Sequence, residues 1–381
     1  MTTNSHQINY LELLPAVDVK YLMAKSGKPA LAVVKADGYG HGLLPVAKSA
    51  LSAGASWLGV ALLEEAKALR QGGINAPIIA WLTPVTDDFA SAISEDIDIA
   101  IPSLAHLEAI TSAARSLGKC ARVHLEVDTG MSRGGALNEW SELVSSAKAY
   151  QDSGLIKVIG IWSHFARADE AGHEFNNKQL ENFKSAVAEA KSVGITPEVI
   201  HLSNSAAAIN DADSHFDLLR LGIAIYGLSP DFSHMGSSEK LNLKPAMSIR
   251  ARIHLVKDIP AGSQVGYGGS AITKVDTKLG VIAMGYSDGI PRNANSEAGV
   301  LVGNKRAPII GRVSMDQFVV DLGRDSSAKA GDWAYIIGSN PSDSYTSASS
   351  YTADSWASAS ATINYEIVTR IAARVKRIYQ G

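Results

Sequence analysis

With 381 residues, the chain is too long for one ordinary core and is the right size for a barrel of roughly 200 to 250 residues plus a second domain. Hydrophobic residues make up 46% of the chain and charged residues 19%, which excludes global disorder. The formal net charge is -3, and the basic residues are scattered along the chain, which argues against nucleic acid or an anionic membrane as a partner.

The N-terminus and the single cysteine narrow the class of protein further. Residues 1–10 lack the basic, apolar and small-residue order of a signal peptide, and no apolar run approaches the roughly 20 residues of a membrane span. We therefore expect a cytoplasmic protein. Cys120 stands alone, which excludes internal disulfides and thiolate metal clusters, and we interpret it as an apolar filler beside a strand. No metal site is expected.

Short β-rich runs alternate with helical patterns through the first 230 residues. Most of these runs are continuously apolar, which is typical of parallel strands covered on both faces. Eight such strands predict a TIM-like (β/α) barrel, an α/β fold, over residues 10–232. The expected strands are Leu31–Lys35, Trp57–Ala61, Pro77–Leu82, Ile97–Pro102, Arg122–Asp128, Lys157–His164, Glu198–Leu202 and Leu219–Tyr226.

Helical spacing of apolar residues fills several of the intervals between the strands, and a glycine closes each predicted helix. The expected helices are Leu62–Gln71, Ser103–Leu117, Asn138–Ser153 and Glu174–Val193, closed by Gly72, Gly118, Gly154 and Gly194.

After Ser229–Glu239, which is rich in serine and turn formers, strands follow one another without long helices. This succession of strands predicts a mostly antiparallel β domain, made of residues 1–9 and 233–381. The Ser-rich stretch Gly338–Ser360 is expected to be an exposed loop that runs into a short helix. The expected strands of this domain are Ala246–Lys257, Lys278–Met284, Ala307–Ile310, Gln317–Asp321 and Trp333–Ile337.

Chemically useful residues stand where the barrel strands stop, at the end where such barrels hold their active sites. Each is unremarkable alone, because a strand-end lysine is commonly a solvated charge and a lone histidine a structural residue. Together they suit pyridoxal phosphate, since lysine can form a Schiff base, arginines pair with carboxylate or phenolate, and backbone amides cradle phosphate. The residues are Lys35, Arg133, His164, Ser203, Asn204, Ser205, Arg220, Gly222 and Ile223.

The segment VVKADGYGHG, which contains Lys35, resembles the cofactor-lysine signature of the bacterial alanine racemase family. The segments DTGMSRGG, SHFARAD, HLSNSAA, RLGIAIYG, VGYGGS, MGYSDGIPR, GRVSMDQ and TINYEI follow in the family's order, and the resemblance extends from Ala32 to Tyr379. It implies a pyridoxal-phosphate-dependent racemase of fold type III. Such an enzyme interconverts L-alanine and D-alanine by a two-base mechanism and supplies D-alanine for peptidoglycan.

The resemblance assigns roles residue by residue. Lys35 would hold the cofactor and move a proton on one face of the substrate, while Tyr267 would serve the opposite face. The residues implied to contact the phosphate are Tyr39, Ser205, Gly222, Ile223 and Tyr365.

Arg220 would face the pyridine nitrogen of the cofactor. A guanidinium only donates hydrogen bonds, so the nitrogen must stay unprotonated, which weakens the cofactor as an electron sink and favours racemisation. His164 would orient Tyr267 and link it to Arg220. Arg133 would pair with the cofactor's phenolate oxygen and the substrate carboxylate, and Met315 would also bind substrate.

The resemblance also implies a homodimer in which Tyr267, Tyr286, Met315 and Asp316 come from the partner subunit. A phenol with an ordinary pKa near 10 must lie where phenolate is favoured before it can act as a base. A positively charged neighbourhood of His164 and Arg220 could favour it. The implied entrance residues are Tyr286, Tyr365, Asp169, Arg292, Arg312 and Ile363.

Several positions depart from the family pattern, among them Ser132, Gly135 and Ser314, which are small-for-small changes. Glu126 stands where many relatives carry a carbamylated lysine. Our hypothesis is that Glu126 supplies a permanent negative charge that orients Arg133, and the alternative is a strand carboxylate that faces elsewhere.

Other functions remain open at this stage. A broader alanine and serine racemase is possible because a pocket discriminates weakly against one added hydroxyl. A fold-related amino-acid decarboxylase is disfavoured, because its pattern places an acid where Arg220 stands. A non-enzymatic pyridoxal-phosphate carrier would lack the β domain and Tyr267.

Overall fold

The structure is a computed structural model that describes residues 9–13, 18–339 and 350–380. It divides into two compact units, each described separately below. The barrel unit comprises Ala16–Gly38 and Leu43–Leu243, and the β unit comprises Met1–Pro15, Tyr39–Gly42 and Lys244–Gly381.

These limits differ from the predicted ones in three places. Strand β1 (Asn9–Leu13) belongs to the β unit, because it pairs with two strands of that sheet. The barrel unit ends at Leu243, about ten residues later than predicted, and Tyr39–Gly42 join the β unit. Strand pairing over such sequence distances cannot be read from local composition.

Eight parallel strands form the barrel sheet, in the order β8-β7-β6-β5-β4-β3-β2-β9. Backbone hydrogen bonds from Arg220 N–H to Ser203 O and from Asp217 N–H to Ile200 O, both 3.0 Å, link the two outer members β8 and β9. The predicted barrel is therefore confirmed. The strands are β2 (Ala30–Val33), β3 (Trp57–Val60), β4 (Ile78–Ala80), β5 (Asp98–Ile101), β6 (Ala121–Glu126), β7 (Ile156–Trp162), β8 (Val199–His201) and β9 (Leu219–Leu221).

The last barrel strand is shorter than predicted, because it ends at Leu221 and a 3-10 turn, η2 (Ile223–Tyr226), follows. Gly222 separates the two with φ -101° and ψ -108°, a backbone conformation outside the strand region. The turn places the N–H groups of Ile223 and Ala224 at a helix start, where they have no partner within the turn itself.

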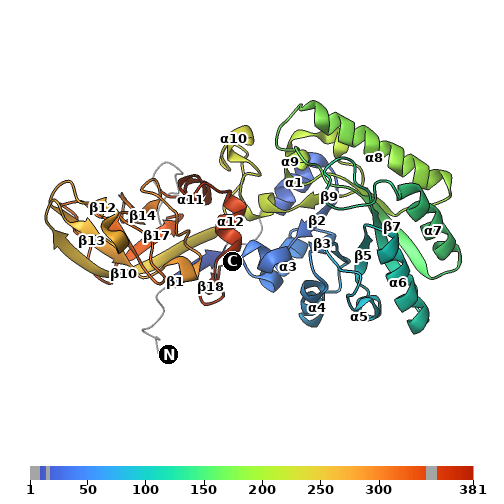
Figure 1. The fold of residues 1–381 in the computed structure, drawn as a ribbon, viewed down its shortest axis with the longest axis horizontal. Helices are drawn as coiled ribbons and strands as arrows, with labels where there is room; N and C mark the ends of the chain where they lie inside the picture. Colours follow the sequence, from blue (N-terminus) through green and yellow to red (C-terminus); the bar gives the residue numbers. More distant parts are fainter. Residues whose placement is uncertain (1–8, 14–17, 340–349, 381) are drawn as a thin grey trace. The chain divides into compact units, whose positions relative to one another are not determined.

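Helices lie outside the barrel strands in Figure 1. The four predicted helices are present within two residues at each end, and Gly118, Gly154 and Gly194 follow three of them with positive φ. After the first, Gly73 and not Gly72 has positive φ. The helices are α1 (Asp18–Ser26), α3 (Leu43–Ser52), α4 (Leu63–Gln71), α5 (Phe89–Ser94), α6 (Leu104–Leu117), α7 (Trp140–Asp152), α8 (Glu174–Ser192), α9 (Ser205–Asn210) and α10 (Phe232–Met235).

The β unit is built around one long strand, β10 (Met247–Ile259), which pairs antiparallel with β1, β13 and β17. Only the pair β1–β18 is parallel, so within the described residues the predicted mostly antiparallel domain is confirmed. The other strands are β11 (Gln264–Val265), β12 (Ala271–Ile272), β13 (Thr277–Ile282), β14 (Gly299–Val302), β15 (Lys305–Pro308), β16 (Phe318–Asp321), β17 (Trp333–Ile337) and β18 (Lys376–Tyr379).

Strands β1, β11, β12, β14 and β18 were not predicted, and the helix expected near Ser360 is α11 (Ala353–Ala359), followed by α12 (Asn364–Thr369). Residues 340–349 of the Ser-rich stretch lie outside the described residues. Trp356 of α11 is fully buried and donates from Nε1 to Ile336 O at 2.7 Å, which anchors the helix on β17.

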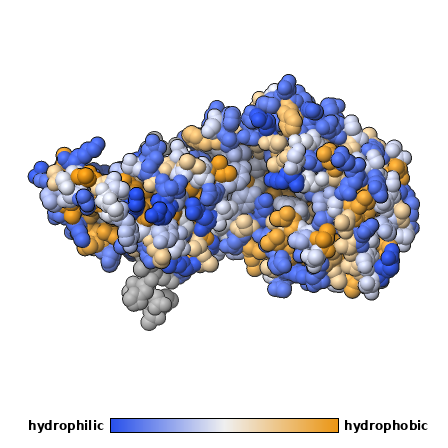
Figure 2. All heavy atoms as spheres, in the orientation of Figure 1, coloured by the Kyte–Doolittle hydropathy of each residue, from blue (hydrophilic) through white to orange (hydrophobic). Residues whose placement is uncertain are grey.

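Hydrophobic residues form small separate patches among hydrophilic ones on the face of the two units drawn in Figure 2. None of the helices in the described part of the chain is long and apolar enough to cross a membrane.

Candidate active site

The chain makes a left-handed turn directly after Lys35. Ala36, Asp37 and Gly38 have φ of 54°, 55° and 60° with ψ near 50°, and Tyr39 has φ 51°. Left-handed backbone costs roughly 1–2 kcal/mol per residue other than glycine, so the surrounding structure must hold this turn. Backbone strain is thus concentrated next to the lysine that the sequence singled out.

Glu65 of α4 is one of the groups that hold the turn. Its Oε1 accepts the N–H of Ala36 at 2.6 Å, and its Oε2 accepts the N–H groups of Ala61 and Leu62 at 2.9 and 3.1 Å. One carboxylate therefore joins the residue after Lys35 to the end of β3 and the start of α4.

Lys35 lies partly buried with its Nζ 5.8 Å from the ring centroid of Trp81. Burial and the positive charge of Arg133 lower the pKa of Lys35, while the Glu65 carboxylate opposes them. The amine consequently loses its proton more readily than a solvated lysine does.

Arg220 is 4% exposed and binds the strand ends around it. Its Nη1 donates to His201 O at 2.8 Å and lies 3.2 Å from His201 Nδ1, and its Nη2 donates to Ser163 O at 2.6 Å and Leu202 O at 2.9 Å. Burial lowers the pKa of the guanidinium to about 9, so it remains a cation at neutral pH. Nε has no hydrogen-bond partner among the described residues.

His164 Nδ1 lies 3.2 Å from Arg220 Nη2. The guanidinium can only donate, so Nδ1 accepts and the ring proton sits on Nε2. Burial, followed by the positive charges of Arg220, Arg133 and Lys35, holds the pKa of His164 well below its usual value. The imidazole is therefore neutral, which corrects the expectation that His164 itself adds positive charge.

Three of the five residues expected at the phosphate, Ser205, Gly222 and Ile223, meet at the start of α9 and η2. The hydroxyl oxygen of Ser205 accepts the N–H groups of Gly222 at 2.8 Å and Ala224 at 3.4 Å. Asn204 caps α9 by accepting the N–H of Ala207 at 3.0 Å. Within the described chain, the hydroxyl hydrogen of Ser205 and the N–H of Ile223 have no partner and can donate to an anion.

Arg133 lies exposed in the loop after β6, which Asp128 shapes by accepting the N–H groups of Gly130 and Ser132 at 2.8 and 3.1 Å. Buried Glu126 packs against the same loop, since a Cβ added to Gly134 would lie 3.0 Å from its Oε1.

The carboxyl group of Glu126 differs from the hypothesis in two respects. No ion pair within 4.0 Å joins it to Arg133 in the described structure. Burial raises the pKa of Glu126 to about 7, against the pull of Arg220 and Arg133, so its negative charge is not permanent near neutral pH.

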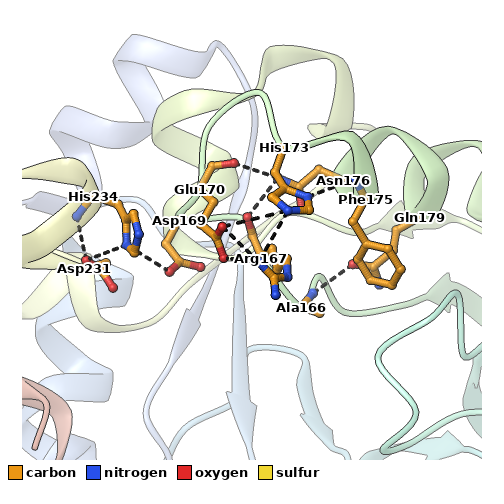
Figure 3. Close-up of polar contacts among 10 residues, drawn as sticks. All are labelled: Ala166, Arg167, Asp169, Glu170, His173, Phe175, Asn176, Gln179, Asp231 and His234. Atoms are coloured by element: carbon orange, nitrogen blue, oxygen red, sulfur yellow. Dashed lines mark hydrogen bonds and ion pairs between the residues drawn. The ribbon is translucent and has the colours of Figure 1, made fainter.

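Gln179 of α8, fully buried, ties the loops after β6 and β7 together. Its amide nitrogen donates to Thr129 Oγ1 at 3.2 Å and His164 O at 3.1 Å, and its oxygen accepts the N–H of Ala166 at 2.9 Å. Figure 3 includes this last contact, next to the polar loop that carries Asp169.

Asp169, an expected entrance residue, lies beside α10. Figure 3 shows its carboxylate near His234, with Asp169 Oδ2 4.0 Å from His234 Nδ1. Asp231 caps α10 by accepting the N–H of His234 at 2.8 Å. The neighbouring Arg167 pairs with Glu170 at 2.8 Å, which braces the same loop.

In the β unit, Tyr39 lies next to Tyr365. Their ring centroids are 6.1 Å apart, and burial raises the pKa of the Tyr39 phenol. The segment that follows is held by Arg377 Nε, which donates to Gly40 O at 3.0 Å. A Cβ at Gly40 would lie 2.0 Å from Val368 O, so only glycine fits there.

A second group in the β unit collects Tyr286, Met315 and Asp316. Backbone N–H groups of Tyr286 and Ser287 donate to Ser314 O and Met315 O, both at 3.0 Å. Arg374 bridges Asp316 and Asp288 at 2.6 Å each. Although Asp316 was expected at a subunit interface, its carboxylate is already paired within its own chain.

Tyr267 opens the turn η3 (Tyr267–Gly269) and is 70% exposed. The turn lies against Arg312, whose Nη1 would be 3.3 Å from a Cβ at Gly268. Met315 and Ile363 are likewise more than half exposed, and Arg292 is exposed. These β-unit residues are thus open to a partner within the described structure of one chain.

Sequence reasoning missed Glu65, Gln179 and a buried polar set inside the barrel. The clearest signal was polar residues in otherwise apolar strands, namely Asp98, His124 and His201. A buried polar group needs a partner, so such residues mark a network.

Two family models match the chain: "Alanine racemase, N-terminal domain" over residues 18–230 and "Alanine racemase, C-terminal domain" over residues 246–379. An alanine racemase of Salinispora tropica is 44% identical over 366 residues, which cover 96% of this chain and 95% of the relative.

Solved structures agree with these matches. The crystal structure of alanine racemase from D-cycloserine-producing Streptomyces lavendulae is 44% identical with a TM-score of 0.94, covering 99% of this chain and 98% of that one. Alanine racemase from Bacillus anthracis with bound L-Ala-P is 32% identical with a TM-score of 0.86, covering 100% and 96%. The chain therefore belongs to the alanine racemase family.

Proposed function

We propose that this chain interconverts L-alanine and D-alanine with pyridoxal phosphate, and that Lys35 and Tyr267 are its two acid/base groups. The observation that supports this most is the binding of Arg220. Its two terminal nitrogens are held by the backbone and histidines of the strand ends, while Nε–H has no partner in the described structure. Nε is not among the buried unpartnered side-chain atoms of the described residues, so this donor on an otherwise buried residue is accessible to a ligand that supplies an acceptor.

The donors in the barrel unit fit pyridoxal phosphate. When bound, this cofactor supplies an electron-withdrawing ring that acidifies the α C–H bond of an amino acid. Nε–H of Arg220 would donate to the ring nitrogen and keep it unprotonated. The Ser205 hydroxyl and the Ile223 N–H would donate to the phosphate, with Gly222 held in place by Ser205.

Lys35 would hold the cofactor and move the α-proton on one face of the substrate. Its lowered pKa favours the neutral amine, which can accept a proton. Arg133, in the loop after β6, would pair with the substrate carboxylate.

Tyr267 would protonate or deprotonate the opposite face from a second copy of the chain, together with Tyr286, Met315 and Asp316. The exposure of Tyr267 in its own chain leaves it available to such a partner. His164 Nε2–H would then donate to the phenolic oxygen, which favours phenolate. Asp169, Arg292, Arg312, Ile363, Tyr286 and Tyr365 would form the entrance.

A circular-dichroism assay of the purified protein with L-alanine and with L-serine tests this function. We expect loss of optical activity with L-alanine, and the rate with L-serine measures specificity. The visible absorbance band of bound pyridoxal phosphate should disappear after borohydride reduction of the wild type. It should be absent in Lys35→Ala and normal in Lys48→Ala, a matched change of an exposed lysine. Stable optical activity in the loaded wild-type protein would overturn the proposal and leave a cofactor carrier.

A further inference from the structure

Four polar side chains from separate barrel strands form one buried chain of contacts. Asp98 starts β5, His124 lies in β6, His201 ends β8 and Arg220 lies in β9, and each is at most 4% exposed. Asp98 Oδ2 is 3.3 Å from His124 Nε2, His124 Nδ1 is 3.0 Å from His201 Nε2, and His201 Nδ1 is 3.2 Å from Arg220 Nη1. The contacts connect a carboxylate to the guanidinium without a break.

Strand β7 lies between β6 and β8, so the contact between His124 and His201 must pass over it. The residue of β7 in register with His124 is Gly160. A Cβ at that position would lie 2.1 Å from His124 Nδ1. The absence of a side chain at Gly160 is therefore what permits the two imidazoles to meet.

The direction of every hydrogen bond in this chain follows from its two ends. The guanidinium of Arg220 only donates, so Nδ1 of His201 must accept and its proton must sit on Nε2. That proton faces His124, whose Nδ1 must accept, so the proton of His124 also sits on Nε2. It donates to the carboxylate of Asp98. Any other protonation would set two donors against each other at 3.0 or 3.2 Å.

We propose that Asp98, His124 and His201 are positioning residues that hold Arg220 through this one-directional chain and so leave its Nε–H as the free donor. Because the role of Arg220 toward the cofactor is itself proposed above, the inference deepens that function and rests on it. The arrangement of protons in the chain is a property of the protein alone, and it can be measured without any ligand.

The side chains packed around these hydrogen-bonded residues exclude other hydrogen-bond partners in the described barrel. The ring of Trp162 stacks on His201 with centroids 5.9 Å apart and planes at 5°, and Trp57 meets the edge of His124 at 5.4 Å. Arg122 binds the other side of Asp98, with Nε 2.5 Å from Oδ1.

These neighbours fix the charges as well as the geometry. Burial, with the positive charge of Arg220 next, holds the pKa of His201 well below its usual value. Burial would raise the pKa of Asp98, but the hydrogen bond from His124 and the ion pair with Arg122 outweigh it and lower that pKa. The chain thus runs from a guanidinium cation through neutral His201 to a carboxylate anion.

Nitrogen NMR of histidine-labelled protein without cofactor tests the proton arrangement directly. We expect His124 and His201 each to show the neutral tautomer with its proton on Nε2, and we expect His201 to keep it between about pH 5.5 and 8.5. A proton on Nδ1 of either neutral ring, or titration of His201 in this range, would overturn the inference whatever the activity of the enzyme. Loss of racemisation with these tautomers intact would instead count against the proposed function alone.

Three variants separate charge, hydrogen bonding and general stability. Asp98→Asn keeps an acceptor for His124, so the tautomers should persist. Asp98→Leu removes the acceptor, so the single tautomer pattern should be lost. In this variant kcat for alanine should fall about tenfold. KM should stay within about twofold of the wild-type value, because none of the hydrogen-bonded residues from Asp98 to His201 touches the substrate. Arg122→Met breaks the ion pair on the far side of Asp98 and is the matched control.

The control should keep both tautomers and the wild-type kcat even if its thermal midpoint falls. The inference is wrong if Asp98→Leu retains both the tautomer pattern and the wild-type kcat, or if Arg122→Met lowers kcat as much as Asp98→Leu does. If Asp98→Leu does not fold, the tautomers of the wild type and of Asp98→Asn still decide whether the hydrogen bonds run in one direction from Arg220 to Asp98.

Discussion

In the barrel unit, Arg220 and His164 are fixed by hydrogen bonds to strand ends and by burial, whereas in the β unit Tyr267 is 70% and Met315 54% exposed. The barrel groups are already arranged for a ligand within one chain. The β-unit groups have their backbones fixed but their side chains open. Under the proposed function, the barrel groups of one chain would form one part of an active site, and its exposed β-unit groups would complete the site of a second copy.

The largest expected effect is that of Tyr267→Phe, which changes an exposed group of the β unit and leaves the barrel groups, such as Arg220 and His164, unchanged. General acid/base groups commonly contribute 10²–10⁴-fold, so racemisation should fall by about that factor. The side chain is mostly exposed, so the thermal midpoint of the protein should stay the same.

Solvent deuterium exchange at the α-carbon sharpens this experiment. With Lys35 intact, Tyr267→Phe should still exchange the α-hydrogen of one alanine enantiomer, while the other enantiomer exchanges far more slowly. Equal exchange of both enantiomers at the wild-type rate would show that the phenol is not the second base.

The next effect concerns Glu126, which is buried in the barrel unit. Its pKa is raised from 4.5 to about 7, so the folded state binds the proton more tightly than the unfolded state. The stability from this proton is fully present below about pH 4.5 and is lost as the pH rises through about 7. The loss amounts to at most about 3 kcal/mol, from 1.36 kcal/mol per pKa unit.

Glu126→Gln removes this titration. Relative to the wild type, its thermal midpoint should therefore be higher at pH 8 than at pH 5. Glu142→Gln, at an exposed position of α7, should show no such difference. If the thermal midpoints of the wild type and of Glu126→Gln change with pH in the same way, the pKa of Glu126 is not raised. The hypothesis that Glu126 carries a permanent negative charge would then stand.

A smaller effect is expected at Glu65, which holds the strained turn after Lys35. Glutamine has one acceptor oxygen, so Glu65→Gln cannot accept the N–H groups of Ala36 and of Ala61 together as the carboxylate does. These hydrogen bonds are exposed or partly buried, so losing one should cost only about 1 kcal/mol, seen as a lower thermal midpoint and a weaker band of bound pyridoxal phosphate. Glu64→Gln, on the exposed side of the same helix, is the control. If the two variants have the same thermal midpoint and the same absorbance band, Glu65 does not hold the turn after Lys35.

The sequence was sufficient for the features that depend on local pattern. Continuous apolar runs located the barrel strands, and the resemblance led to Lys35, Arg220 and Tyr267. Pairing between distant segments was not accessible, which is why residues 10–13 of the unpredicted strand β1 were counted with the barrel. The partners of buried side chains were equally hidden, so the neutral state of His164 and the missing ion pair of Glu126 emerged only from the packing around them.

Mixing two inactive variants tests the central claim, that each site combines Lys35 of one chain with Tyr267 of another. Lys35→Ala and Tyr267→Phe are purified separately, dissociated, mixed in equal amounts and reassociated. Random pairing makes half of the dimers mixed, and each mixed dimer has one intact site, so we expect about a quarter of the wild-type racemase activity. If both groups of a site came from the same chain, no dimer in the mixture would hold an intact site. Activity that stays at the level of the separate variants, with mixed dimers verified by mass, would contradict the account.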